Sequence, residues 1–446
     1  MINELRPKLP EETFVKDAGE KYLFLIPSKP DWVVTNRNGA IALSLCNGER
    51  SIAQIKELLS PIHPDPLSAT TFLEKLDKEG FFQPSNEKQL KKSDQQPNLN
   101  SVHLNISSDC NLNCSYCYAD EREAIGTPLS LAEYRVIIDE LASMNKTMTV
   151  AITGGEPLMN ANACDISLYC KSKGFYTYLL TNATLINESN AKQISSSFDE
   201  IRISVDGYKS ATHDFYRGAG SHEKTVRAIN LLETAGANIR IAMTVTKQNI
   251  GEIELMAKSY GSRLTFQPLF MAGSARNNSE IAITGEEYFH ALNNAKGVAP
   301  MGDLGHSLER LRGRGATSCA IANGEISISH NGDVYPCHML HAPEFYAGNI
   351  RESNISNIYS QSAALKKIRQ QSIYTRENCT ICPIRLLCGG GCRARTYYLT
   401  GDLNGVDDFC EYELLAFIEG LMQSAVLKDG SSSNLVEMRE EMDSLT

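Results

Sequence analysis

Short apolar runs alternate with helix-like segments through the middle of the chain. The runs are VHLNI at 102–106, VAIT at 150–153, YTYLLT at 176–181, IRISV at 201–205, IRIAMTV at 239–245 and LTFQP at 264–268. Strand-like runs separated by helical spacing are typical of parallel βα units. We therefore predict an α/β fold in which about six such units, within residues 101–300, form a partial (β/α)6 barrel. Ligands of such a barrel bind at the carboxyl ends of its strands.

A different pattern precedes the barrel. Residues 1–83 predict a small α+β module. Its two strand-like and three helix-like segments lie at 21–26, 32–35, 38–45, 51–59 and 70–79. Ser51 and Gln54 have the spacing of a capping box at the start of the second helix. The segment 84–100 is polar and contains two prolines, so we interpret it as a linker.

Beyond the barrel, strand signals become few and cysteines become dense. We predict that residues 301–423 form a domain organised around metal. The tail at 424–446 is polar and acidic, and we assign it no function.

The composition is that of a soluble globular protein. Of the 446 residues, 42% are hydrophobic and 22% are charged, close to average values. No run reaches about 18 consecutive apolar residues, and the first residues lack the apolar core of a signal peptide. The net charge of -10 disfavours a nucleic-acid backbone as the main partner. We expect a cytoplasmic protein with no membrane and no nucleic-acid partner.

Thirteen cysteines are the unusual feature of this composition. Disulfides are rare in a reducing compartment, so clustered cysteines there are more often metal ligands or catalytic groups. Ten of them fall into three groups, which are Cys110, Cys114 and Cys117; Cys319 and Cys337; and Cys379, Cys382, Cys388, Cys392 and Cys410. Cys46, Cys164 and Cys170 have apolar or helical surroundings, which predict small buried hydrophobic residues.

The first group, Cys110-x3-Cys114-x2-Cys117, directly follows a predicted strand. Three thiolates with this spacing can bind three irons of a [4Fe-4S] cluster and leave the fourth iron open. A structural zinc site is the alternative, but such sites fill four positions, and no fourth cysteine or histidine follows closely. With Tyr116 before the last cysteine, the motif resembles the signature of the radical S-adenosylmethionine superfamily. The resemblance implies S-adenosylmethionine bound at the open iron, and hydrogen abstraction by a 5'-deoxyadenosyl radical.

Four further motifs resemble the cofactor pocket of that superfamily. They are Thr153-Gly154-Gly155-Glu156-Pro157 after the second strand, Thr181-Asn182 after the third, Ser204 with Asp206 after the fourth, and Arg217 in HDFYRG. In the first motif, the missing glycine side chains would let the backbone approach a ligand, and a carboxylate can meet an ammonium group. The resemblance implies that the second and third motifs contact the ribose or methionine moiety and that Arg217 pairs with the cofactor's carboxylate. Turn, capping and salt-bridge roles are the alternatives.

The later cysteines resemble those of the SPASM domain, which carries auxiliary clusters in radical enzymes that act on peptides and proteins. The resemblance implies one [4Fe-4S] cluster bound by four of them, which are Cys379, Cys382, Cys388 and Cys410. A second cluster would be bound by Cys319, Cys337 and Cys392. This second cluster has only three thiolates, so an open iron, a non-cysteine ligand and a substrate thiolate all remain alternatives. Two structural zinc sites are the alternative to iron.

His338 directly follows Cys337. In the similar sulfatase-maturating enzymes, an aspartate near this place is the proposed base, so a histidine here argues against sulfatase maturation. We take His338 as a candidate catalytic residue, with metal ligation and packing as alternatives.

The amino-terminal module resembles the precursor-peptide recognition element, a winged-helix-like domain similar to the peptide chaperone of pyrroloquinoline quinone synthesis. Residues 32–59 carry the match, as a strand, a helix, a turn and a second helix. Such domains bind a leader peptide as an added strand. A winged helix for DNA is the alternative, but Lys56 is the only basic residue inside the second helix, which suits a phosphate backbone poorly.

Together the resemblances cover about residues 15–415 and imply an iron-sulfur oxidoreductase that matures a ribosomally synthesised precursor peptide. The thioether-forming sactipeptide synthases are the most similar group, so a thioether or another side-chain crosslink is the expected product. Three [4Fe-4S] clusters and S-adenosylmethionine are the expected cofactors. The expected partners are the precursor, held by its leader, and an electron donor such as flavodoxin or ferredoxin.

Three alternatives remain open. A peptide epimerase needs a hydrogen donor, for which Cys164 and Cys170 are candidates. An enzyme acting on a small molecule such as a tetrapyrrole is the second, and a non-catalytic zinc-binding regulator is the third.

Overall fold

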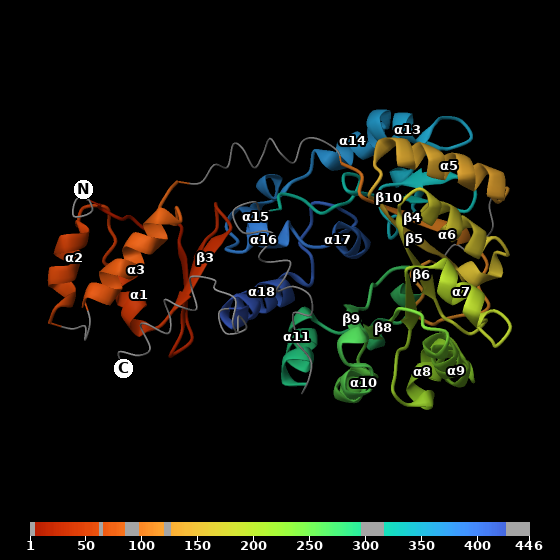
Figure 1. Cartoon of the computed structure of the whole chain (residues 1–446), viewed down its shortest axis with the longest axis horizontal. Coiled ribbons are helices and arrows are strands. Elements are labelled where there is room, and N and C mark those ends of the chain that lie inside the picture. Colours follow the sequence, from red (N-terminus) through yellow and green to blue (C-terminus); the bar gives the residue numbers. More distant parts are fainter. Residues whose placement is uncertain (1–4, 62–65, 85–97, 120–125, 296–315, 425–446) are drawn as a thin grey trace.

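The computed structural model describes residues 5–61, 66–84, 98–119, 126–295 and 316–424. Two sheets organise this part of the chain (Figure 1). One has three strands and lies near the amino terminus, and the other has nine strands and continues into the cysteine-rich region. The predicted linker and tail lie almost entirely outside the described residues, as does the start of the predicted carboxy-terminal domain.

The amino-terminal module has three antiparallel strands followed by three helices, in agreement with the predicted α+β class. The elements are β1 Phe14–Asp17, β2 Tyr22–Ile26, β3 Asp31–Thr35, α1 Arg37–Ser44, α2 Ile52–Leu59 and α3 Pro66–Lys78, with the strand order β1-β2-β3. The capping box of Ser51 and Gln54 is confirmed. The sequence pattern missed β1, because its FVKD side chains are mostly exposed and lack the apolar alternation of a strand.

The six predicted parallel strands are all present. They are β4 Ser101–Ser107, β5 Thr149–Gly154, β6 Tyr176–Thr181, β7 Glu200–Ser204, β8 Ile239–Val245 and β9 Leu264–Pro268. The helices α5 Leu131–Met144, α6 Ala163–Ser172, α7 Ala191–Ser197, α9 Ser221–Thr234 and α10 Ile253–Tyr260 share one apolar core with these strands (Figure 1). Alternate strand residues such as Val102, Leu104 and Ile106 face that core, which leaves the intervening residues for the opposite face of the sheet.

Three further strands extend this sheet and were not predicted. The strand β10 Glu325–Ile328 pairs parallel to β4, and β11 Asp333–Tyr335 and β12 Gly348–Asn349 continue antiparallel. These strands are too short for a clear pattern. Their pairing joins the cysteine-rich region to the first strand of the barrel. The remaining helices are α8 Ser210–Arg217, α11 Gly285–Asn294, α13 Ile355–Gln361, α14 Ala363–Arg369, α15 Glu377–Thr380, α16 Arg385–Cys388, α17 Arg393–Thr400 and α18 Cys410–Ser424.

The small sheet is buried on both faces. On one face, Val33 packs in a core with α1, α2 and α3. On the other, Trp32 and Val34 join an apolar cluster with Phe417 and Leu421 of α18. An ion pair between Arg385 and Glu12, with 2.8 Å between Nη2 and Oε2, supports the same interface. The module is therefore docked onto the cysteine-rich region by direct packing.

Two of the three isolated cysteines are buried apolar residues, as predicted. Cys46 and Cys170 lie in apolar cores, and burial raises the pKa of both thiols to about 12. Cys164 is half-buried and packs against the main core. The helices of the described residues are all too short or too polar to cross a membrane.

Replacing an apolar residue of α18 should loosen the docked sheet. We expect Phe417→Ala to destabilise this interface by about 3–5 kcal/mol, because a buried aromatic ring is removed. Trp32 is the only tryptophan, so its emission should shift to the red as water reaches the indole. Urea unfolding and tryptophan fluorescence measure both effects. Ile381→Ala is the control, since that side chain is 84% exposed. An unshifted emission in Phe417→Ala would contradict the docking.

Candidate functional site

The first cysteine group lies in a loop that directly follows β4. Cys110, Cys114 and Cys117 are all partly buried, and the Cys114 thiol interacts electrostatically with the other two. Burial raises the pKa of Cys114. The loop from 110 to 117 contains no helix or strand, so its backbone polar groups must find partners elsewhere.

The glycine-rich motif after β5 holds the segment that leads into this loop. The Gly155 N–H donates to the Ser107 carbonyl at 2.7 Å, and the Glu156 N–H donates to the Asp109 carbonyl at 2.8 Å. A Cβ atom on Gly155 would lie 2.3 Å from the Asp109 carbonyl oxygen, and one on Gly154 would lie 2.3 Å from that of Ser107. The backbone that approaches these glycines is therefore that of residues 107–109, which lead into the cysteine loop. The approach of a ligand to these glycines stays a prediction.

Glu156 joins the end of β6 to this motif. Its side chain is fully buried, and its carboxylate accepts hydrogen bonds from Thr181 Oγ1 at 2.7 Å and from the Asn182 N–H at 2.9 Å. Burial raises the pKa of Glu156. Asn182 in turn donates to Asn111 Oδ1 inside the cysteine loop at 3.0 Å. Pro157 begins a single 3-10 turn. A contact between Glu156 and an ammonium group stays a prediction.

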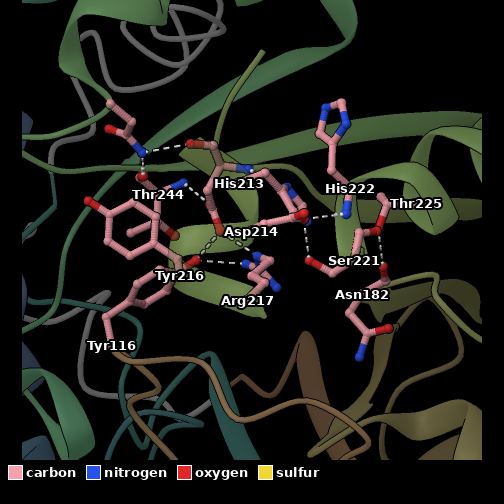
Figure 2. A network of polar contacts seen from close by, with 12 residues as sticks. Tyr116, Asn182, His213, Asp214, Tyr216, Arg217, Ser221, His222, Thr225 and Thr244 are labelled. Atoms are coloured by element: carbon pink, nitrogen blue, oxygen red, sulfur yellow. Dashed lines mark hydrogen bonds and ion pairs between the residues drawn. The ribbon is translucent and has the colours of Figure 1, made fainter. Parts of the chain in front are cut away.

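Asp206 connects the cysteine loop to the next strands, and Figure 2 labels its partners Tyr116, Arg217 and Thr244. Its fully buried carboxylate accepts hydrogen bonds from the Tyr116 hydroxyl and from the Thr244 N–H, the latter at 3.0 Å. Arg217 forms an ion pair with Asp206 and donates to the Tyr116 hydroxyl at 2.8 Å. The partner of Arg217 in the structure is the protein's own Asp206. A contact between Arg217 and the carboxylate of the cofactor stays a prediction. Ser204 is the last residue of β7 and is half-buried.

The far side of the loop is held by residues that sequence reasoning missed. The Ser274 N–H donates to the Cys117 carbonyl at 2.9 Å, and Asn278 Nδ2 donates to the Ser115 carbonyl at 3.1 Å. Gly273 has φ +57°, and a Cβ there would lie 2.3 Å from the Cys117 carbonyl oxygen. These residues follow the last barrel strand, and no spacing rule connects them with the cysteines.

The later cysteines gather in two sets. The Cys337 thiol interacts electrostatically with Cys319 and Cys392. A second series of such interactions links Cys379 with Cys382 and Cys410, and Cys410 with Cys388. The structure therefore brings together the same two sets that we predicted. Ligation of a cluster by each set stays a prediction.

The surroundings of these thiols suit iron-sulfur clusters. Burial raises the pKa of Cys319, Cys337 and Cys392, so these thiols keep their protons until a metal replaces them. Backbone N–H groups point at two of the sulfurs, with 3.1 Å from Gly391 N to Cys388 Sγ and 3.5 Å from Met339 N to Cys337 Sγ. Such N–H groups stabilise cluster sulfurs.

His338 lies beside the three-cysteine set and belongs to a group that sequence reasoning missed. Its Nδ1 is 3.0 Å from Glu325 Oε1 and must donate there, because an ionised carboxylate only accepts. Its ring stacks on His103 of β4, with centroids 4.1 Å apart and planes 12° apart. Burial lowers the pKa of His103 to about 3. Burial opposes ionisation of Glu325, but the hydrogen bond from His338 and the charges of both imidazoles lower its pKa to about 2.

The side chains of His103, Glu325 and His338 are close enough to suggest a metal site. A histidine nitrogen binds a metal within the plane of its ring. The two stacked rings are almost parallel, so their planes do not converge on one ion. The arrangement therefore favours a hydrogen-bonded polar group over a mononuclear metal site.

Two protein families match this chain. The Radical SAM superfamily matches residues 104–259, and SPASM, described as an iron-sulfur cluster-binding domain, matches residues 319–383. The first segment contains Cys110, Cys114 and Cys117. The second begins at Cys319.

Three curated relatives are a heme synthase, a maturase and a bacteriocin biosynthesis protein. The AdoMet-dependent heme synthase of Nitratidesulfovibrio vulgaris is 27% identical over 72% of this chain and 94% of that protein. The mycofactocin maturase MftC of Mycobacterium tuberculosis is 26% identical over 68% of this chain and 80% of that protein. The antilisterial bacteriocin subtilosin biosynthesis protein AlbA of Bacillus subtilis is 31% identical over 64% of this chain and 65% of that protein.

Solved structures share the fold. The anSMEcpe structure with bound AdoMet has a TM-score of 0.64 at 19% identity and covers 77% of this chain and 98% of its own. Streptococcus suis SuiB bound to precursor peptide SuiA has a TM-score of 0.58 at 14% identity, over 90% of this chain and 98% of its own.

Substituting Gly155 should disturb the first cysteine group selectively. We expect Gly155→Ala to lose most of the iron of that group, because its Cβ would collide with the backbone of Asp109 and displace the loop. Iron analysis and low-temperature electron paramagnetic resonance of the reduced protein measure this loss. Gly251→Ala is the matched control, because a Cβ at Gly251 meets no atom within 4 Å. An unaltered first-cluster signal in Gly155→Ala would show that the loop does not depend on this contact.

His213 should make the fold sensitive to mild acid. Burial and the charge of Arg217 lower its pKa to about 4, and its Nδ1 accepts the Asp206 N–H at 3.3 Å. The unfolded chain binds a proton near pH 6.5 and the folded chain does not, so stability is lost as the pH falls from about 6.5 towards 4. Between pH 7.5 and 5.5, the parent should lose about 1 kcal/mol more than His213→Asn in urea unfolding. Parallel losses in both proteins would contradict this assignment.

The matched families, the fold neighbours and the three sets of thiols agree with one another. Radical SAM and SPASM domains imply one [4Fe-4S] cluster together with auxiliary clusters, and AdoMet is bound in the solved neighbours. This chain is therefore an enzyme of the radical SAM superfamily with a carboxy-terminal SPASM iron-sulfur domain.

Proposed function

We propose that this enzyme modifies a ribosomally synthesised precursor peptide and forms a thioether or another side-chain crosslink. The docked three-stranded sheet is the observation that carries the proposal. Among the strands that the structure describes, the order β1-β2-β3 places β3 at an edge, and Trp32 and Val34 hold that strand against α18. An edge strand offers backbone N–H and C=O groups to which an extended peptide can add.

The β3 edge suits a leader peptide better than the β1 edge does. Most of β3 is buried, with α1 to α3 on one face and α18 on the other. The side chains of a strand added there would contact α1 to α3 on one face and α18 on the other. By contrast, three of the four residues of β1 are exposed. The helix α18 begins at Cys410, so a leader on β3 would lie close to the cysteine-rich region.

The names of the relatives support a peptide substrate. MftC is named a maturase, AlbA is named for bacteriocin biosynthesis, and SuiB was solved with its precursor peptide. These properties belong to the named proteins, and by similarity they support a peptide substrate for this chain.

We propose that the substrate contacts the sheet face opposite the helices, which carries a row of polar, mostly buried side chains. The Arg202 guanidinium lies 4.0 Å from the centre of the Tyr178 ring, and the Tyr178 ring lies 6.3 Å from that of His103. His103 stacks on His338, so the polar row ends beside the three-cysteine set. We retain His338 as the candidate catalytic side chain, since it lies where this polar face meets the cysteine-rich region.

The chain's own residues position and shield the reaction. When bound, the first cluster and S-adenosylmethionine supply the radical that removes a hydrogen atom from the substrate. Tyr116, Asp206 and Arg217 hold the cysteine loop with buried polar contacts. We propose that Thr181, Asn182, Ser204 and the glycine-rich motif, which line the same strand ends, bind the cofactor.

The isolated cysteines do not favour the epimerase alternative. Cys164 and Cys170 lie on α6, in the helix layer, and Cys170 is part of the core between the helices and the sheet. A hydrogen donor is needed on the polar face, where the substrate would lie.

A small-molecule reaction is the second candidate. The heme synthase of Nitratidesulfovibrio vulgaris matches over 94% of its length, and a tetrapyrrole would not require the docked sheet.

One experiment separates these candidates. The reduced holoenzyme is incubated with S-adenosylmethionine and each short peptide encoded beside its gene, or with a tetrapyrrole, and the products are analysed by mass spectrometry. A crosslink should appear as the loss of two hydrogens from one peptide. Unchanged peptides together with a converted tetrapyrrole would favour the second candidate, and an unchanged mass with inverted stereochemistry would indicate an epimerase.

Hydrogen exchange tests the leader site itself. On addition of the precursor, the amides of β3 should exchange several-fold more slowly, because an added strand pairs with them. The amides of β1 are the internal control and should exchange at an unchanged rate. Protection of β1 with none at β3 would contradict the proposed edge.

A further inference from the structure

Two buried arginines lie between the two carboxy-terminal cysteine sets. Arg376 precedes α15 and is 5% exposed, and Arg393 begins α17 and is 2% exposed. The Arg376 side chain interacts with Cys379 of one set and Cys319 of the other. Arg393 likewise interacts with Cys319 and with Cys410. Both arginines also line one pocket together with Cys319, so each guanidinium is close enough to thiols of both sets to interact with them.

Neutral backbone groups hold these guanidinium groups in place. Arg393 donates to the Leu403 carbonyl at 2.8 Å, to the Gly405 carbonyl at 3.2 Å and to the Gly390 carbonyl. Arg376 donates to the Gly390 carbonyl at 3.5 Å. Gly390 makes room for this arrangement, because a Cβ there would lie 2.0 Å from Arg376 Nη1. These contacts fix the position of both charges but neutralise neither.

The carboxylate of Asp407 pairs with a different arginine. Arg395, in the same helix as Arg393, forms a two-point ion pair with Asp407 at 2.6 and 2.9 Å. Among the residues that the structure describes, neither Arg376 nor Arg393 has a carboxylate within 4.0 Å, and the Nε atom of each is buried without a hydrogen-bond partner. A buried cation without a counter-charge is strongly destabilising.

A pocket beside Cys319 brings the unpartnered groups together. Its cavity volume is about 10 Å³, and its lining includes Cys319, Arg376, Arg393, Arg369 and Gln371. The Gln371 Oε1 atom is also buried without a partner. An anionic group next to Cys319 would supply the missing counter-charge, and a [4Fe-4S] cluster bound by thiolates is such a group.

We propose that Arg376 and Arg393 form a cationic bridge between the two auxiliary clusters and raise their reduction potentials. Each cluster gains one electron on reduction and becomes more negative. A positive charge fixed nearby, in a medium of low dielectric constant, therefore favours the reduced form. The inference rests on the proposed ligation of two clusters by the two cysteine sets and does not depend on the identity of the substrate.

The test is a redox titration with dithionite, followed by electron paramagnetic resonance on the full-length, iron-loaded protein. Arg376→Gln and Arg393→Gln should each make reduction of an auxiliary cluster at least about tenfold less favourable, which is about 59 mV for a one-electron couple. Arg376→Lys and Arg393→Lys keep the charge and should stay closer to the parent. Iron and sulfide contents of the parent test the ligation separately from the potentials.

Arg369→Gln is the matched control. Arg369 lines the same pocket, but its guanidinium packs over Tyr359 at 4.3 Å and its Nε donates to the Ala322 carbonyl at 2.8 Å. Its replacement should therefore shift the auxiliary potentials less. Equal shifts in all three glutamine variants would overturn the bridge in favour of a general charge effect.

Gln371→Glu provides a second test that does not remove an arginine. The change is nearly isosteric and places a carboxylate in the pocket beside both guanidinium groups. Because the new carboxylate would pair with them, the auxiliary potentials should fall as in the glutamine variants. If Gln371→Glu and the iron-loaded arginine variants all keep the parental potentials, the proposal is wrong.

Discussion

The cysteine loop can bind a cluster only if a segment without helix or strand is held in one conformation. Such a segment cannot satisfy its own backbone groups, so its partners must come from the surrounding fold. Here they come from the ends of several barrel strands. The glycine-rich motif pairs with the residues before Cys110, Asn182 reaches Asn111, and the residues after β9 hold the carbonyl of Cys117. The parallel sheet matters because it brings these strand ends to one edge.

Buried electrostatics complete this support. The Asp206 carboxylate is shielded from water and binds Tyr116, Arg217 and the backbone of β8 at once (Figure 2). A buried carboxylate is tolerated only when it is paired and hydrogen-bonded, and this one is both. Removing Arg217 would leave the charge of Asp206 uncompensated in the core. The tyrosine inside the cysteine motif thus ties the loop to the barrel.

The cysteine-rich region is joined to the rest of the molecule in two ways. The strand β10 adds to β4 of the barrel, and α18 packs against the amino-terminal sheet. One continuous set of contacts therefore runs from the proposed leader site through the region of the auxiliary thiols to the barrel. In the proposed reaction, this continuity would keep a long peptide in register with the site of hydrogen abstraction.

Local patterns in the sequence were enough to predict the six barrel strands, the capping box at Ser51 and the first cysteine group. The two later sets of thiols were predicted from the resemblance to the SPASM domain. Apolar alternation, capping and cysteine spacing act over a few residues, so the sequence alone determines them. Only the tertiary structure decided which groups meet across long separations. Asn105 bonds to Ser327, 222 positions later, and Tyr116 bonds to Asp206, 90 positions later. The same holds for the stacking of His103 on His338 and for the two arginines between the cysteine sets. These contacts arise from packing in three dimensions, and no repeat or spacing along the chain predicts them.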